Sequence, residues 1–141
     1  MNAYFNSLKR IADNVPNVNV NINSNRKMAT VSYGPGTFVT TTFKPDTKSV
    51  HINYGRTHQN IRRKGVGTML RALITLAAKN AKVNKVTQRS VHTKNTKNIE
   101  KPPSYYIMKK LGYNQISPIN FEYNTSKNNK NMLYSFISKF S

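Results

Sequence analysis

The stretch Arg62-Arg63-Lys64-Gly65-Val66-Gly67-Thr68 runs directly into an apolar segment, Met69 to Ala78, and is the most informative part of the sequence. Two glycines one residue apart allow the backbone to pass close to a ligand. The free amides at the start of a helix carry about half a positive charge, and three cationic side chains stand at the same place. The sequence therefore predicts a phosphate-binding turn, with an extended polyanion such as a pyrophosphate as its ligand.

The segment after this turn has the periodicity of an amphipathic helix. Its apolar residues recur every three or four positions: Val66, Leu70, Leu73, Ala77 and Ala81. Three further apolar residues widen this side: Met69, Ile74 and Leu76. The polar residues fall mostly on the other side, where solvent is expected: Arg71, Thr75, Lys79 and Lys82.

Two short motifs resemble those of a known family. Arg62-x-x-Gly65-x-Gly67 resembles the R/Q-x-x-G-x-G/A motif of the GNAT superfamily of N-acetyltransferases, which opens the central helix and binds the pyrophosphate of acetyl-coenzyme A. The segment Tyr105 to Tyr113 resembles the family's Y-x-x-x-G-F segment. The motifs occur in the order that the family has, and together they favour this fold.

Alternation, helical spacing and turn residues predict the order of elements along the chain. Helices are expected over 4–12, from 66 onward and over 104–111, where Gly112 closes the last one. Strands are expected over 18–23, 28–33, 37–43, 49–54, 85–92, 120–123 and 132–137. This order predicts a single α/β domain over residues 1–141, a three-layer α/β/α arrangement around a mixed, mostly antiparallel sheet, and it resembles the GNAT fold over nearly the whole chain.

The charge balance is extreme. Lys and Arg number 23 against 4 acidic residues, giving a formal charge of +19 and a pI near 10.5. This charge exceeds what solubility requires, so a polyanionic partner is expected, nucleic acid or a nucleic-acid-rich particle. The alternative is a solvated basic surface without a partner.

Cysteine is absent, which excludes disulfides, thiolate metal sites and cysteine nucleophiles, and no metal site is predicted. The sequence shows neither a secretion signal nor an apolar run of about 18 residues that would span a membrane. A cytoplasmic location, or one inside a virus particle, is expected, and secretion is not. The 20 asparagines, with abundant lysine and isoleucine, suggest an AT-rich genome such as a virus or phage has.

The resemblance implies a binding site for acetyl-coenzyme A. In the family, the backbone of the strand before the glycine motif bonds the pantetheine arm and the thioester oxygen, a role that falls here to Arg56, Thr57, His58 and Gln59. Arg62 and the amides of the turn would hold the pyrophosphate: Arg63, Lys64, Gly65, Val66, Gly67 and Thr68. A basic loop could reach the adenosine phosphates through Lys94, Lys97 and Lys101.

The residues for proton transfer are less well defined. Met108 stands where the family's usual tyrosine donates a proton, and Tyr105, one helical turn earlier, is the candidate substitute, although a tyrosine there is more often packed against the sheet. Histidines can act as the general base, and we expect His58 and His92 to be better placed than His51. Each of them could instead be an ordinary surface or core residue, with ordered water as the base.

Three functions remain open at this stage. The first is an acetyl-coenzyme A-dependent N-acetyltransferase whose acceptor is associated with nucleic acid, because the chain lacks the carboxylates for an acidic groove that binds basic proteins. The second is a catalytically inactive GNAT-fold structural or nucleic-acid-binding protein of a virus particle or ribonucleoprotein. The third is a turn that binds nucleic-acid phosphates in place of a cofactor. The sequence does not decide the oligomeric state.

Overall fold

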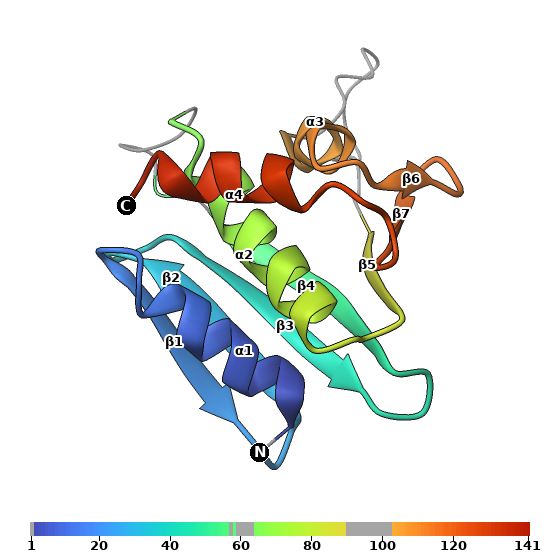
Figure 1. Cartoon of the computed structure of the whole chain (residues 1–141), viewed down its shortest axis with the longest axis horizontal. Coiled ribbons are helices and arrows are strands. Elements are labelled where there is room, and N and C mark those ends of the chain that lie inside the picture. The colour runs from blue at the N-terminus through green and yellow to red at the C-terminus, as the bar shows by residue number, and fades with distance from the viewer. Residues whose placement is uncertain (1, 57, 59–63, 90–102) are drawn as a thin grey trace, which may run out of the picture.

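In the computed structural model, residues 2–56, 58, 64–89 and 103–141 are described (Figure 1). Within these ranges the chain forms four helices and seven strands. The helices are α1 (Ala3–Ala12), α2 (Val66–Asn80), α3 (Pro103–Lys110) and α4 (Lys130–Ser138). The strands are β1 (Val18–Asn23), β2 (Met28–Tyr33), β3 (Phe38–Lys44), β4 (Ser49–Arg56), β5 (Lys85–Arg89), β6 (Asn114–Gln115) and β7 (Asn120–Asn124). No described helix combines the length and the apolar character needed to span a bilayer.

The strands form one sheet in the order β1-β2-β3-β4-β5-β7-β6. Strands β1 to β4 form an antiparallel meander, and β7 pairs antiparallel with both β5 and β6. Only β4 and β5 run parallel, because α2 carries the chain from the end of one strand back to the start of the other. The mixed, mostly antiparallel sheet is therefore confirmed.

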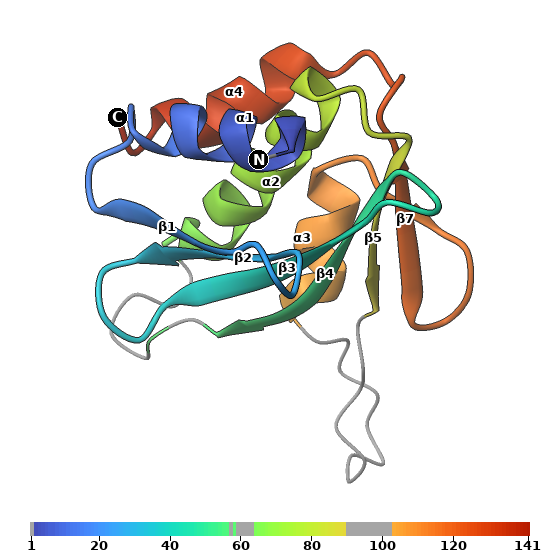
Figure 2. The ribbon, with the colours of Figure 1, turned by 90° about the horizontal axis from the view of Figure 1, so that it is seen from below.

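All four described helices pack on the same face of the sheet. On this face the Tyr4 hydroxyl of α1 hydrogen-bonds Thr41 of β3 at 3.0 Å, and the ring of Tyr105 in α3 lies 5.4 Å from that of Phe121 in β7. Helices α1 and α4 flank α2 above the strands (Figure 2). Among the described residues no helix covers the other face, where a three-layer arrangement would have one. We call this helix-free surface the open face.

Helix α2 is buried more completely than its sequence pattern predicts. The apolar residues lie in the core as expected, but Arg71 is only 7% exposed and Thr75 is fully buried. The Thr75 hydroxyl hydrogen-bonds that of Tyr113 at 2.6 Å. The expectation that these two polar residues face solvent was wrong, because α1, α3, α4 and the sheet surround α2 on most sides.

The end of the chain also differs from its prediction. Residues 132–137 are part of helix α4 and not a strand. Leu133 and Ile137, four residues apart, are buried and pack toward α2, whereas Tyr134 between them is 47% exposed. A short apolar run cannot distinguish a strand from a helix by periodicity alone. The sheet is completed at this edge by β6, a two-residue strand that the sequence did not reveal.

The other predicted elements are confirmed within the described residues, with ends that shift by one or two positions. Strand β5 is described as far as Arg89, so residues 90–92 of its predicted range lie outside the described part. Gly112 closes α3 with a left-handed backbone (φ +87°). Its N–H donates to the Lys109 carbonyl, and the next N–H donates to the Met108 carbonyl at 3.0 Å.

The helical assignment of α4 predicts different costs for neighbouring substitutions. Leu133→Ala should lower the free energy of unfolding by about 2–5 kcal/mol, because it leaves a cavity against α2. Tyr134→Ala should change it by less than about 0.5 kcal/mol, since this side chain faces solvent. Urea unfolding followed by circular dichroism measures both, and equal losses would contradict the packing of α4.

Candidate active site

Strands β4 and β5 diverge in the middle of the sheet. Their parallel register runs from Ser49 and Lys85 to Ile52 and Gln88, and the described residues contain no further pair. Strand β4 continues to Arg56, and its register with β3 shifts between Thr40 and Thr41, which leaves Asn53 outside the pairing. Backbone groups of β4 beyond Ile52 that face β5 therefore have no strand partner among the described residues, so they can hydrogen-bond a ligand.

We call the described part of β4 beyond Ile52, together with the facing end of β5, the opening. Helix α2 begins beside it with a glycine. Gly65 is its N-cap and has a left-handed backbone (φ +84°, ψ 6°), a conformation that glycine adopts without a steric penalty. Among the described residues no side chain caps the helix by a hydrogen bond. The amides of the first turn and the helix dipole thus favour an anion here, as the sequence predicts.

A basic pocket of about 250 Å³ opens next to the start of α2. It is lined by Lys64, Gly65, Thr68, Lys110, Phe136, Lys139 and Phe140. Three lysines and two aromatic rings, without an acidic residue, suit a ligand with phosphate groups and a planar base. Phe136 belongs to α4, Lys139 is its C-cap and Phe140 follows it, and the sequence analysis named none of the three as site residues.

Arg71 is the most unusual side chain near the opening. Its guanidinium donates from Nε to the Gln88 side chain at 2.9 Å and from Nη1 to the Gly67 carbonyl at 3.3 Å. A Cβ added at Gly55 would lie 2.6 Å from Nη2, so the guanidinium also lies against β4. One side chain therefore connects α2, β5 and β4 at the point where the two strands diverge.

No carboxylate among the described residues compensates the charge of Arg71. Burial lowers the pKa of the guanidinium to about 10, so it stays charged at neutral pH. Among the described residues the one ion pair joins Lys85 and Glu122 at 3.4 Å. A buried cation without a counterion is costly unless hydrogen bonds or an anionic ligand offset the cost. Arg71 therefore makes the interior of the opening electropositive.

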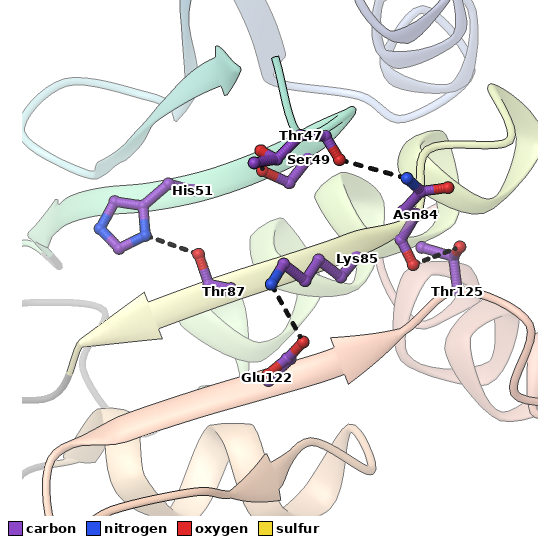
Figure 3. Close-up of polar contacts among 8 residues, drawn as sticks. All are labelled: Thr47, Ser49, His51, Asn84, Lys85, Thr87, Glu122 and Thr125. Carbon is purple, nitrogen blue, oxygen red and sulfur yellow. Dashed lines mark hydrogen bonds and ion pairs between the residues drawn. The ribbon is translucent and has the colours of Figure 1, made fainter. Parts of the chain in front are cut away.

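His51 lies on the open face, next to Ile52, where the described pairing of β4 with β5 ends. Its Nδ1 and the Thr87 hydroxyl are 2.7 Å apart, one residue before the last β4–β5 pair (Figure 3). Figure 3 also shows the Lys85–Glu122 ion pair across β5 and β7. Burial, and then the charge of Lys44, lower the pKa of the His51 imidazole below its ordinary value of 6.5. This imidazole is neutral at pH 7 and can accept a proton.

Of the two histidines that the sequence favours as general base, the structure describes His58 and not His92. The His58 N–H donates to the Thr37 hydroxyl at 2.8 Å, and its ring lies against Gly36, so this residue packs on the β2–β3 turn. His92 lies outside the described residues. The geometry of the described residues favours His51 over His58, whereas His92 stays a prediction.

The aromatic segment of α3 is described in part. Tyr105 is half-buried, and its ring makes edge contacts with Tyr106 and Phe121, each at 5.4 Å between centroids. Met108, at the position of the family's usual tyrosine, is completely buried in the core. Arg56 ends β4 and is exposed, and the Lys64 to Thr68 segment opens α2. The other predicted cofactor contacts lie outside the described residues: Thr57, Gln59, Arg62, Arg63, Lys94, Lys97 and Lys101.

No family model and no curated protein matches the sequence, whereas solved structures match the fold. The ribosomal-protein-S18-alanine N-acetyltransferase of Escherichia coli has 11% identity and a TM-score of 0.54, with 90% of this chain and 91% of that one covered. The PaiA N-acetyltransferase of Thermoplasma acidophilum, solved with coenzyme A, has 12% identity and a TM-score of 0.50, with 69% and 59% covered. Nourseothricin acetyltransferase has 12% identity and a TM-score of 0.51, with 70% and 64% covered.

These similarities establish the fold. The mixed seven-stranded sheet with its four described helices matches the GNAT acyl-coenzyme A N-acyltransferase fold. The chain spans less than two thirds of the length of the nourseothricin and PaiA enzymes. The similar structures are acetyltransferases, but at 11–12% identity the similarity shows the fold alone.

The contact between Gly55 and Arg71 can be tested by a double-mutant cycle. Gly55→Ala should lower the free energy of unfolding by about 1–2 kcal/mol, because the new methyl group displaces the guanidinium from its hydrogen bonds. The same substitution should cost much less when Arg71→Ala has removed that group. Denaturant unfolding of the four proteins gives the coupling.

Gly34→Ala is the matched control for this cycle. Gly34 has a left-handed backbone (φ +59°) and nothing within 4 Å of an added Cβ, so its cost is backbone strain alone. That cost should be the same with and without Arg71. A Gly55→Ala cost that is also independent of Arg71 would contradict the contact.

Proposed function

We propose that this chain is an N-acetyltransferase that takes its acetyl group from acetyl-coenzyme A. The observation that carries the proposal is the divergence of β4 and β5 directly beside an uncapped helix N-terminus. Such an opening offers unpaired backbone groups to an extended, amide-containing arm and an anion site to its phosphates. The fold similarity to acetyltransferases supports the same function, and one similar structure was solved with coenzyme A.

The described residues fit such a cofactor by charge and shape. The amides from Lys64 to Thr68 would bind the pyrophosphate, and the pocket lined by Lys110, Lys139 and two phenylalanines would hold the nucleotide. The backbone of β4 from Asn53 to Arg56 would bond the amide-containing arm. Arg62 and Arg63, which precede this segment in the sequence, would add charge to the phosphate site.

His51 is the proposed general base for the acceptor amine. Acetyl-coenzyme A supplies an activated acyl carbon, to which the nitrogen of a neutral amine bonds while the carbon–sulfur bond breaks. The His51 imidazole accepts the proton that this nitrogen loses, and Tyr105 is the proposed donor of a proton to the departing thiolate. An amine on the open face would meet His51 where β4 and β5 begin to diverge.

The acceptor is proposed to be an amine carried on, or lying beside, nucleic acid. With 23 basic and 4 acidic residues, the chain attracts polyanions and repels basic protein tails. The cytoplasm and the interior of a virus particle are the proposed locations, because both hold such acceptors.

An inactive nucleic-acid-binding protein with this fold is the second candidate function. Complete burial of Met108 at the usual tyrosine position favours it, since this side chain cannot donate a proton to the thiolate. In that case the +19 charge would carry the function, and the turn before α2 would bind phosphates of nucleic acid.

Calorimetric titration with acetyl-coenzyme A tests the cofactor site. The protein should bind one equivalent saturably at a salt concentration high enough to screen general attraction between polycation and polyanion. Gly67→Leu should weaken binding at least tenfold, because the side chain fills the space that the backbone offers to the phosphates. Lys139→Gln should weaken it about threefold to tenfold through loss of a pocket cation.

Lys82→Asn is the matched control for loss of charge. Lys82 is exposed at the opposite end of α2 and has a left-handed backbone that asparagine tolerates, so binding should stay unchanged. Absence of saturable binding to the unmodified protein would reject the acetyltransferase and leave the second candidate.

The pH dependence of transfer tests the role of His51. The neutral imidazole is the base, so the rate is full above its pKa and is lost as the pH falls through it. Burial lowers this pKa, so the limb in kcat/KM should lie below pH 6.5. His51→Asn should remove that limb and lower kcat by about 10²–10⁴, while the limb of the acceptor amine remains.

His58→Asn provides the comparison, because the sequence favoured that histidine as the base. This variant should keep the limb below pH 6.5 and most of the rate. Loss of the limb in His58→Asn, and its retention in His51→Asn, would contradict the assignment.

A further inference from the structure

We infer that the open face of the sheet binds single-stranded nucleic acid. The strand register identifies the side chains of this face, because directly paired residues on neighbouring strands point to the same side. One row contains Asn21, Thr30, Thr40 and Tyr54, and another contains Asn19, Ser32, Phe38 and Arg56. A third row contains Asn23, Met28, Thr42, His51, Thr87 and Glu122.

Two aromatic side chains form the centre of the proposed surface. Phe38 and Tyr54 lie on neighbouring strands, and their ring centroids are 5.8 Å apart. Tyr54 is 58% exposed, which places a large ring in solvent on a face where no described helix covers it. Exposed rings on a sheet are the platform on which unpaired bases stack, and such stacking tolerates any base.

The side chains around these rings offer hydrogen bonds without negative charge. Asn19, Asn21 and Asn23 are exposed along β1. On β2 and β3 the Thr30 and Thr40 hydroxyls are 3.4 Å apart, and Asn53 donates to the Thr42 hydroxyl at 2.6 Å. Amides and hydroxyls of this kind can bond base edges and sugar hydroxyls alike.

Cations outnumber acids on the open face among the described residues. Lys44, Arg56 and Arg89 are exposed, and the register places each of them on the open face. The same face carries Lys85 and the acidic Glu122, which form an ion pair with each other. These three cations therefore have no ion pair among the described residues and are available to phosphates.

The combination of rings and cations favours a single strand over a duplex. A duplex keeps its base faces stacked inside, so it could use only the cations. An acidic polypeptide could also use the cations, but it has no regular series of planar rings to stack on Phe38 and Tyr54. An unpaired polynucleotide uses both features of the surface.

This binding does not depend on the transferase activity proposed above. Because His51 belongs to the same face, an amine on a bound strand would lie near the proposed base. The experiment is done without acetyl-coenzyme A, so its failure would leave the cofactor site intact, and loss of the cofactor site would leave this surface intact.

Fluorescence anisotropy with a labelled single strand of about 12 nucleotides, as RNA and as DNA, measures the binding. The single strands should bind more tightly than a duplex of the same sequence at moderate salt. Tyr54→Leu should weaken binding about fivefold to tenfold, because it keeps apolar bulk but removes the ring. Tyr54→Phe should bind like the unmodified protein.

Matched variants on the helical side separate a specific surface from general charge attraction. Tyr134→Leu removes a comparably exposed ring on α4 and should leave the affinity unchanged. Arg56→Gln with Arg89→Gln should reduce the slope of log affinity against log salt by about 1.4, at about 0.7 for each phosphate contact. Lys9→Gln with Arg10→Gln, two exposed cations of α1, should not change the slope.

Three results would overturn the inference. Unchanged affinity in Tyr54→Leu would exclude stacking on this face. Equal affinity for duplex and single strand, with equal effects of the two double charge variants, would show attraction by net charge alone. Displacement of the strand by polyglutamate at the same charge concentration as by an unlabelled strand would assign the surface to acidic polypeptides.

Discussion

The parallel pairing of β4 and β5 is the constraint on which the site depends. Parallel neighbours need a long crossover, and α2 provides it, so the start of this helix necessarily lies near the end of β4. Because the last described pair is Ile52 and Gln88, the backbone of β4 beyond that point has no strand partner on this side among the described residues. The same connection thus brings together an uncapped helix N-terminus and unpaired strand backbone, which are the two parts of a site for an extended anionic ligand.

The side chain of Arg71 connects α2, β5 and β4 in the interior of this arrangement. A guanidinium that bonds Gln88 and the Gly67 carbonyl fixes the first turns of α2 against β5, and Gly55 provides the space for it on β4. A neutral side chain could fill the same volume at a lower desolvation cost, so the stability of the core does not explain the choice of arginine. The charge makes the opening electropositive, which would favour an anionic ligand there.

The sequence was sufficient for features that depend on local chemistry. Asparagine and proline at the end of α1, alternation in β1 and β2, and Gly112 after α3 are local signals, and the elements follow them. The sequence-based predictions were wrong where the surrounding helices and strands determine burial or secondary structure. Arg71 looks solvent-facing on a helical projection because the projection contains no neighbouring helices, and the run from Met132 to Ile137 has no period that separates a strand from a helix. The position of His51 beside the end of the β4–β5 pairing could not be read from the sequence, since the parallel register is a tertiary feature.

If the chain has the proposed function, the two faces of its sheet would hold its two anionic ligands separately. Cofactor phosphates and nucleic-acid phosphates compete for the same cations, so one shared basic groove would let either ligand displace the other. Here the pocket with Lys110 and Lys139 lies on the helical side of the sheet, whereas Arg56 and Arg89 lie on the open face. In the proposed function, a group held on one side would meet a group held on the other beside Ile52 and Gln88, where the described β4–β5 pairing ends. With the proposed function, a chain with so few acidic residues would bind its two anionic ligands on opposite sides of the sheet.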